Sequence, residues 1–311
     1  MTDVIERFAV MSVDEVRGFF RDSDVLEVTA VIRDADDDEL RRLIGIEHFR
    51  AEGVGAILDR FPEFADAARL REIEGVVRFR LARGAGRTEV HTARFAAGQV
   101  SLAPNAKPDV TIDAGIVDFV RLVTGQSNAA LLYLGGRLAI EGQALLALAV
   151  GSVFTVPGSD EVAVDPTMLD PVDVATVVAT TSAKHMRTVM EGDFRPVVLG
   201  EVFRRFPDFI DAGKAGSLVL TIGFRIGGRR DGQVDRYVVH IRDGSCSIET
   251  DPPEGQRRDA TISLDGVDFL RLATGQLHPV RGVLTGAMKV KGDRAKALAL
   301  NAVMVPPQPR R

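Results

Sequence analysis

The chain has very few of the residues that stabilise secreted or membrane-spanning proteins. Its 311 residues include one cysteine, two tyrosines and no tryptophan. A single cysteine cannot form an intrachain disulfide, which fits a reducing compartment. The longest uncharged stretch, 142–159, contains glycine and proline and is shorter than the ~20 apolar residues of a membrane-spanning helix. The acidic start, 1–8, has no signal-peptide pattern. We expect a soluble cytoplasmic protein.

Sequence motifs for catalysis and metal binding are also missing. There is no Gly-x-Ser-x-Gly nucleophile turn, Walker loop or His-Glu-x-x-His motif. The histidines are scattered without metal-ligand spacing: His48, His91, His185, His240 and His278. The acidic run 36–39 is best explained as the capped start of a helix. We therefore predict no catalytic residue, cofactor or metal, and no enzyme activity.

The charge distribution does not favour nucleic acid as a partner. The formal net charge is −5, and a surface that follows phosphates usually carries more positive charge. One compact basic group occurs, made of Lys289, Lys291, Arg294 and Lys296. A solvated surface explains this group, and a weak transient contact with anionic lipid headgroups is the alternative.

An internal repeat defines the organisation of the chain. The segment 109–126, with the pattern Asp-Val-Thr-Ile followed by Asp-Phe-Val-Arg-Leu-Val-Thr-Gly-Gln, returns at 259–276 with an offset of 150. Upstream, Arg-Phe-Pro-Glu-Phe at 60–64 returns at 205–209 with an offset of 145. The five-residue difference must be absorbed in loops, one of which is the first hairpin of each copy. The period is too long for a solenoid, so each copy should be a complete domain.

Periodicity predicts the same order of elements in each copy. Helices end near Phe61 or Phe206, because the residue before a proline disfavours helical geometry. Alternating patterns then predict three strands, with a tight hairpin turn at 243–244. A fourth strand, a helix, a fifth strand and a last helix follow. The helix around Phe119 should place Asp118 and Arg121 outside, and Gly125 or Gly275 should close it in the left-handed region.

These patterns predict an α+β protein: two tandem copies of a five-stranded mixed sheet, each covered on one face by helices. The first domain, with additional N-terminal helices, should span 1–158. A linker rich in proline, glycine and aspartate should span 159–170, and the second domain 171–311. Cys246 falls at an inward strand position, where it should behave as a small hydrophobic residue.

The last helices of the two copies differ in their predicted surroundings. In the second copy an apolar stripe lies opposite Arg294 and Lys296. In the first copy, the helix at 144–150 is apolar on all sides. Such a helix is normally covered, so we expect it to pack against the second copy or against a second chain in a homodimer, or to touch a membrane. Leu148 is the candidate outward residue.

The segment 259–293 closely resembles the C-terminal half of sterol carrier protein type-2 domains. The resemblance rests on the Asp-Phe-x-x-Leu-x-Thr-Gly helix end, on Pro279, and on the glycine-flanked strand from Gly286 to Gly292. The first copy is similar but lacks the proline, since Ser-Asn-Ala stands at 127–129. The chain therefore looks like a tandem pair of these nonspecific lipid-transfer modules, a layout met in bacterial relatives.

This resemblance implies an intracellular lipid-binding or lipid-transfer protein without catalytic residues. Its apolar tunnel would hold acyl chains, acyl-CoA or sterol-like ligands. The candidate ligand-binding residues are Phe119, Leu122, Leu138 and Ile140 in the first copy, and Phe269, Leu272, Met288 and Val290 in the second. Periodicity alone cannot distinguish a lined cavity from a packed core. The alternative function is therefore a non-catalytic interaction or dimerisation scaffold in which one or both tunnels are lost. An enzyme with an unrecognised site is the third reading.

Overall fold

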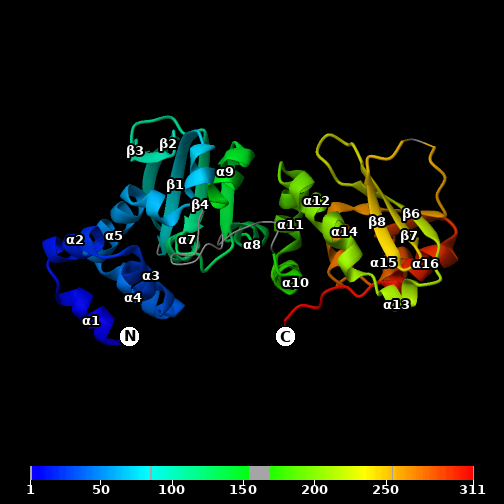
Figure 1. Cartoon of the computed structure of the whole chain (residues 1–311), viewed down its shortest axis with the longest axis horizontal. Helices are drawn as coiled ribbons and strands as arrows, with labels where there is room; N and C mark the ends of the chain where they lie inside the picture. The colour runs from blue at the N-terminus through cyan, green and yellow to red at the C-terminus, as the bar shows by residue number, and fades with distance from the viewer. Residues whose placement is uncertain (1, 85, 154–168, 254, 311) are drawn as a thin grey trace. The chain divides into compact units, whose positions relative to one another are not determined.

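Two compact units make up the chain, Met1–Met168 and Leu169–Arg311, here called the first and second unit. Figure 1 shows the computed structural model, which describes residues 2–84, 86–153, 169–253 and 255–310. Most of the predicted linker, 159–170, lies outside the described residues, as does the end of the first predicted domain.

Each unit begins with helices and continues into a sheet with intervening helices. The first unit contains α1 (Thr2–Val10), α2 (Val13–Asp22), α3 (Val25–Arg33), α4 (Asp37–Gly45), α5 (Glu47–Asp59), η1 (Phe61–Phe64), α6 (Ala67–Arg71), β1 (Gly75–Gly84), β2 (Arg87–Ala96), β3 (Gln99–Leu102), β4 (Val110–Gly115), α7 (Ile116–Val123), α8 (Ala129–Leu134), β5 (Leu138–Gly142) and α9 (Ala144–Gly151). The second contains α10 (Pro171–Thr180), α11 (Ala183–Glu191), α12 (Arg195–Arg205), η3 (Phe206–Phe209), α13 (Ala212–Ala215), β6 (Leu220–Gly227), β7 (Asp235–Arg242), β8 (Ser245–Thr250), β9 (Ala260–Asp265), α14 (Gly266–Ala273), α15 (Pro279–Thr285), β10 (Met288–Gly292) and α16 (Arg294–Val303).

The two sheets have the same topology. Their strand orders are β3-β2-β1-β4-β5 and β8-β7-β6-β9-β10. The central pairs, β1 with β4 and β6 with β9, are parallel, and every other pair in the two sheets is antiparallel. Side chains alternate between the helix-covered face and an open face, as the burial of alternate residues in β6 shows. The α+β fold with two mixed five-stranded sheets is confirmed.

Local sequence explains several element boundaries. The turn between β7 and β8 has φ of 52° at Asp243 and 75° at Gly244, the geometry of the predicted two-residue hairpin. Gly125 and Gly275 follow the ends of α7 and α14 with φ of 73° and 72°, as predicted. The acidic run begins α4 through a capping box in which Asp36 is the N-cap residue.

The structural repeat extends further upstream than the sequence anchors. Helices α3–α5 correspond in order to α10–α12 of the second unit. A buried arginine lies near the start of α5 and of α12, Arg50 in one unit and Arg195 in the other. Arg50 Nε lies 2.5 Å from a carboxylate oxygen of Glu89, and Arg195 Nε lies 2.7 Å from one of Asp235. Both acids belong to the second strand of their sheet, so the same buried ion pair ties helix to sheet in each unit.

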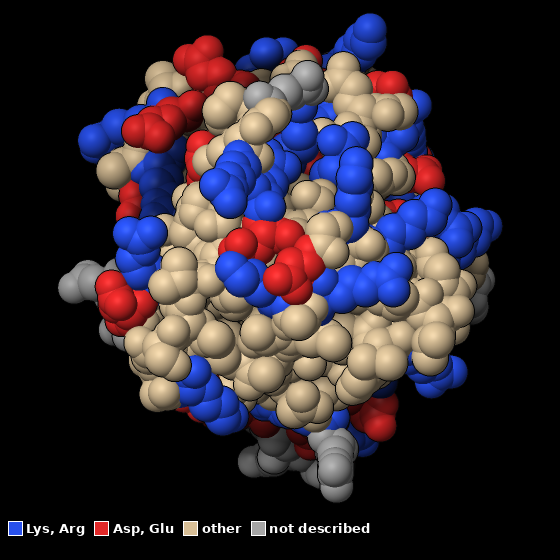
Figure 2. Space-filling model, turned by 90° about the vertical axis from the view of Figure 1, so that its right-hand side faces the viewer, with Lys and Arg blue, Asp and Glu red and all other residues tan. Residues whose placement is uncertain are grey.

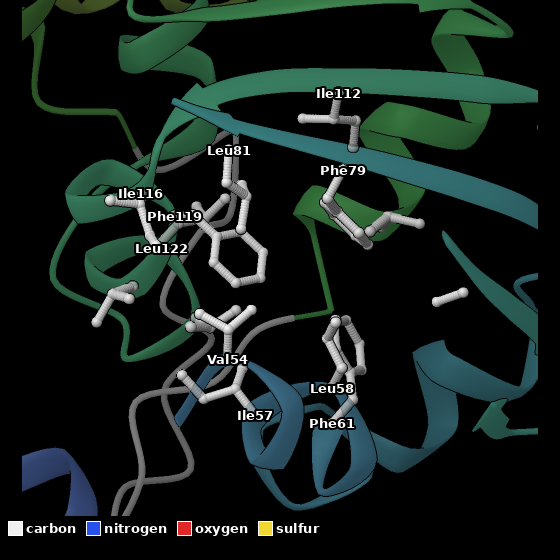
Figure 3. Close-up of a cluster of buried hydrophobic side chains, with 14 of the residues drawn as sticks. Val54, Ile57, Leu58, Phe61, Phe79, Leu81, Ile112, Ile116, Phe119 and Leu122 are labelled. Atoms are coloured by element: carbon white, nitrogen blue, oxygen red, sulfur yellow. The ribbon is translucent and has the colours of Figure 1, made fainter. Parts of the chain in front are cut away.

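The first unit has a large apolar core and two helices, α1 and α2, that precede the repeated part. Figure 3 shows side chains of α5, β1, β4 and α7 pointing toward one another, with Val54 and Ile57 facing Phe119 and Leu122. The added helices extend this core through Phe8, whose ring centroid lies 4.7 Å from that of Phe49. Interdigitated burial of this kind is the main source of stability in a domain core.

The register of the sheets shows where the five-residue difference between the copies is absorbed. Phe79 and Phe224 occupy matching places in the central strands, and His91 and Tyr237 in the next ones, so the first hairpin absorbs one residue. The other four residues lie between the hairpin that follows and the fourth strand, in the connection that ends at Asp259.

Two side chains of α7 do not lie where the sequence pattern predicts. Asp118 is buried, not outside, and forms an ion pair with Arg137. Arg121 is largely covered, and its Nε lies 2.8 Å from a carboxylate oxygen of Asp37 in α4. The prediction of an outer position for both was wrong because their charges are compensated by partners distant in sequence.

Candidate functional site

The second unit contains an apolar cavity of about 420 Å³. It lies between the β10 edge of the sheet and helices α14, α15 and α16. Its lining consists of Phe224, Ile262, Leu272, Pro279, Val280, Val283, Leu284, Gly286, Met288, Lys289, Val290, Arg294, Ala297, Leu298, Leu300, Asn301 and Met304. Sites for small ligands are typically mostly apolar clefts of ~300–1,000 Å³ with few polar groups, and this cavity has those properties.

A short helix forms one wall of the cavity because of its sequence. α15 begins at Pro279, which suits a first helical position because it lacks an N–H group. It ends at Gly286, which adopts φ of 78° and turns the chain toward the edge strand β10. The buried Gly282 lies close to this strand, and a Cβ there would lie 3.4 Å from Cβ of Met288. The helix is therefore held directly beside the strand that bounds the cavity.

Among the described residues of the lining, two cations are the only charged side chains. Lys289 belongs to β10 and Arg294 begins α16, and both are exposed. Neither forms an ion pair with a carboxylate among the described residues. The lining also contains Asn301 but no acidic residue. An apolar cavity with unpaired cations can hold an apolar chain while its edge attracts an anionic group.

The four candidate residues of the second copy separate into two environments. Leu272, Met288 and Val290 line the cavity. Phe269 is absent from the lining and is buried in an aromatic cluster, where its ring stacks on Phe203 with 4.9 Å between centroids. Most of the lining, including the α15 residues, was not predicted from the sequence as part of a site. The apolar spacing of that short helix is the feature that could have indicated these residues, but the same spacing is typical of a packed core.

The four candidates of the first copy lie in or against its core. Phe119, Leu122 and Leu138 are buried, and the Phe119 ring lies 5.3 Å from that of Phe79. Ile140 is partly buried and packs on the same core (Figure 3 shows Phe119 and Leu122). Contact of any of these residues with a ligand stays a prediction.

The first unit also has a polar cavity of about 460 Å³, between α4, the β1–β2 hairpin and the start of α7. Its lining includes Arg50 and Arg137, which pair with Glu89 and Asp118. Because these cations already have carboxylate partners, the cavity differs in chemistry from the apolar one of the second unit.

Reactive groups are scarce in the described part of the chain. Burial raises the pKa of the Cys246 thiol to about 11, so the thiol is protonated at neutral pH. Among the described residues no cluster of three metal-ligating side chains occurs. No described helix has the length and apolar character needed to cross a membrane.

Helix α9 is not covered on all sides by described residues. Leu146, Ala147 and Val150 are buried, whereas Leu145 is 76% exposed. Leu148, the candidate outward residue, is only half-buried. Packing of α9 against the second copy or a second chain stays a prediction.

The paired α+β units and the apolar cavity define a class, the tandem-domain proteins that bind hydrophobic ligands. Comparison with known families agrees and is more specific. The chain belongs to the SCP-2 sterol transfer family, whose model matches residues 54–155 and 205–305. A tandem pair of domains of this family is therefore established. The two matches begin in α5 and at the end of α12, so the preceding helices of each unit lie outside them.

Three relatives illustrate the similarity. The hydroxysteroid dehydrogenase-like protein 2 of Xenopus tropicalis is 23% identical over 106 residues, 34% of this chain and 24% of that protein. Sterol carrier protein 2 of Arabidopsis thaliana is 36% identical over 61 residues, 20% of this chain and 48% of that protein. The chain thus spans about a quarter and about half the length of these curated relatives. The structure of apo sterol carrier protein 2 from Yarrowia lipolytica is 22% identical, with a TM-score of 0.29, and the match covers 37% of this chain and 94% of that one.

Proposed function

We propose that the chain is a non-catalytic, cytoplasmic carrier of lipids with an anionic head group, such as fatty acids or acyl-CoA. The observation that carries the proposal is the apolar cavity of the second unit, which has two cations and no carboxylate in its lining. Leu272, Met288 and Val290 are the proposed contacts for the acyl chain, since all three line this cavity.

The energetics suit a carrier that both binds and releases. Burying a chain of about 16 carbons contributes roughly 12 kcal/mol at ~0.8 kcal/mol per methylene group. Association and ordering cost about 4–15 kcal/mol. The net affinity from the chain alone is therefore modest, and an additional interaction with the head group would increase it.

Lys289 and Arg294 are the proposed head-group partners. A carboxylate or phosphate beside them would gain charge-assisted hydrogen bonds, whereas the single hydroxyl of a sterol would gain much less. The matching positions of the first unit hold Ala139 and Ala144. This contrast favours the second unit as the site for anionic lipids.

Displacement of a fluorescent fatty acid from the full-length chain tests whether the cavity binds lipid. Ala297→Phe, which places a ring in the cavity, should weaken binding at least tenfold. Ala295→Phe is the matched control, because Ala295 lies on the same helix but is exposed and outside the lining. Equal binding by both variants would exclude this cavity. No saturable binding by the unaltered chain would favour the scaffold alternative.

A comparison of ligands tests the head-group contacts. The double variant Lys289→Ala/Arg294→Ala copies the first unit, and it should bind a fatty acid about tenfold more weakly. Its affinity for the uncharged alcohol of equal chain length should stay the same. If the affinities for the two ligands fall equally, the two cations affect the shape of the cavity and do not bind the head group.

A further inference from the structure

The open face of the second sheet carries a row of basic side chains. The strand register places Lys289, Ser263, Arg225 and Arg236 side by side across β10, β9, β6 and β7. The row ends beyond β7 beside Asp251, whose N–H bonds to the carbonyl of Arg236. Neighbours on one face of a sheet lie about 5 Å apart, so Arg225 and Arg236 are adjacent, and Lys289 lies one strand further on, across Ser263.

The next row adds two cations. Lys291 and Thr261 lie beside Gly223, and Arg258 lies over this glycine, since a Cβ at Gly223 would come within 2.7 Å of its Cδ. Its Nε is buried and has no hydrogen-bond partner among the described residues. Among the described residues the one acid in this row is Glu249 on β8, and it interacts electrostatically with Arg258. We define the cationic patch as Arg225, Arg236, Arg258, Lys289 and Lys291.

The same two rows are electrically balanced in the first unit. Arg80 occupies the place of Arg225, and its guanidinium lies 2.5 Å from Asp113 and 3.0 Å from Glu141. Asp113 stands where the second unit has Ser263, and Glu141 where it has Lys291. The second unit therefore replaces the carboxylates that neutralise this face with a hydroxyl and a cation.

The cations nearest to β10 have no carboxylate partner. Among the described residues, no acid lies within ion-pair distance of Arg225, Lys289 or Lys291, and all three are exposed. Figure 2, which presents the right-hand side of Figure 1, shows Lys and Arg side chains gathered around a smaller acidic group on that side of the protein. Unpaired exposed cations produce a positive potential that extends over roughly a Debye length of ~8–10 Å.

The cationic patch borders the mouth of the lipid cavity. Lys289 belongs to both, since it lines the cavity and begins the basic row. Apolar side chains of the same lining are exposed: Leu284 by 81%, Leu298 by 51% and Val280 by 46%. An apolar rim beside a field of cations is the composition of surfaces that lie on anionic membranes.

We infer that the second unit docks on anionic lipid bilayers through the cationic patch, with the apolar rim of the cavity facing the membrane. This rests on the proposed carrier function, because docking brings the mouth to the source of the ligand. Nucleic acid would also be attracted by the charge, but the chain has no tryptophan and Tyr237 is buried. The patch therefore lacks the aromatic residues on which bases stack, and exposes aliphatic ones instead.

The test places the acids of the first unit, Asp113 and Glu141, at the matching positions of the second unit. Ser263→Asp/Lys291→Glu removes three units of charge from the patch and changes no residue of the cavity lining. Lys184→Ala/Arg187→Glu on α11 is the control, with an equal charge change at two exposed residues away from the sheet. Sedimentation with phosphatidylcholine vesicles, with and without about a third phosphatidylserine, measures binding by the full-length chain.

We expect binding to anionic vesicles only, with a dissociation constant that rises on the order of a hundredfold in the patch variant. Each charge near such a surface contributes about fivefold. The control should change by less than about threefold, and salt should weaken binding. Equal loss in both variants, equal binding to neutral vesicles, or tighter binding to a DNA duplex at the same salt concentration would overturn the inference.

Fatty-acid displacement without vesicles separates this inference from the proposed function. Both variants should keep the affinity of the unaltered chain for the uncharged alcohol of equal chain length, because neither changes a residue of the cavity lining. An aspartate at position 263 lies beside Lys289, so the patch variant should bind the fatty acid itself more weakly. If the unaltered chain does not bind fatty acid, the carrier function is contradicted, but binding to anionic vesicles through the patch is not. If the double variant does not fold, Lys291→Glu alone, which changes two units of charge at an exposed position, should still weaken vesicle binding about 25-fold, and no change would overturn the inference.

Discussion

The first and second units share a topology but differ in what surrounds it. The first unit has two added helices and an open sheet face on which Arg80 is paired with two acids. The second has an apolar cavity at its sheet edge and unpaired cations beside it. Substitutions at matching positions thus gave one fold two surface chemistries. This comparison shows that the surface chemistry of the two units differs at positions that the repeat does not preserve.

The largest expected difference between the units concerns their buried arginines. Arg195 bonds to Asp235 and to three main-chain carbonyls, whereas Arg50 bonds to Glu89 and one carbonyl. Arg195→Met should destabilise the second unit by about 3–5 kcal/mol, because it leaves several buried acceptors without donors. Arg50→Met should cost the first unit about 1–3 kcal/mol.

Hydrogen exchange read by mass spectrometry checks this, because it reports on peptides of each unit separately. The effect of each variant should be confined to its own unit. Equal losses for the two variants would show that the additional carbonyl bonds of Arg195 contribute nothing to the comparison.

A smaller difference concerns acid sensitivity at the start of the fourth strand. Burial favours protonation of Asp259, but bonds from Lys296 Nζ at 2.7 Å and Thr221 N at 2.8 Å outweigh it and hold its pKa below the usual 3.8. A lowered carboxyl pKa gives stability that is present above the usual pKa and is lost as pH falls through the lowered value. In the first unit, Leu146 stands at the position of Lys296 beside Asp109.

Lys296→Leu should therefore make the second unit resemble the first. We expect a loss of less than about 1 kcal/mol at pH 7, since the pair is partly exposed, and a smaller loss near pH 3. Urea unfolding at the two pH values measures both. A loss that is equal at pH 7 and pH 3 would contradict an electrostatic origin.

The smallest expected effect concerns Cys246, which matches Val100 of the first unit. Because burial raises its pKa to about 11, labelling by a thiol reagent at pH 7 should be at least tenfold slower in the folded chain than in urea. Cys246→Val should change stability by less than about 1 kcal/mol. Rapid labelling of the folded chain would identify a reactive thiol that the second unit alone carries.

Local patterns were sufficient to predict the five strands of each unit, but not the short helices α8 and α15 before the fifth strand, and not the contents of the interiors. The hairpin at 243–244 and the capped start of α4 follow from residues adjacent in sequence. Phe269 and Leu272, by contrast, are three residues apart on one helix and have the same apolar character. One stacks on Phe203 of α12 and the other lines the cavity, because their surroundings come from helices distant in sequence.

The burial of charged side chains could not be predicted from the sequence either. Asp118 and Arg121 have the charge expected of an outer helix face. They are covered because each forms an ion pair, with Arg137 and Asp37 respectively. Helices were predicted before Phe61 and Phe206, but the correspondence of α3–α5 with α10–α12 was not predicted, for a related reason. Their common features are the buried ion pair and the helix order, whereas their apolar residues vary within the volume that each core accepts.

The parallel pair at the centre of each sheet joins strands that are far apart in sequence, which has a consequence for the expected order of folding. β1 and β2 are joined by a short turn, but β4, the other neighbour of β1, begins at residue 110. Closing that long connection costs conformational entropy before the strand contacts can stabilise it. We therefore expect the hairpins to form first and the central pairing later. During synthesis, the first sheet cannot be completed until β5 has left the ribosome, which separates its folding in time from that of the second.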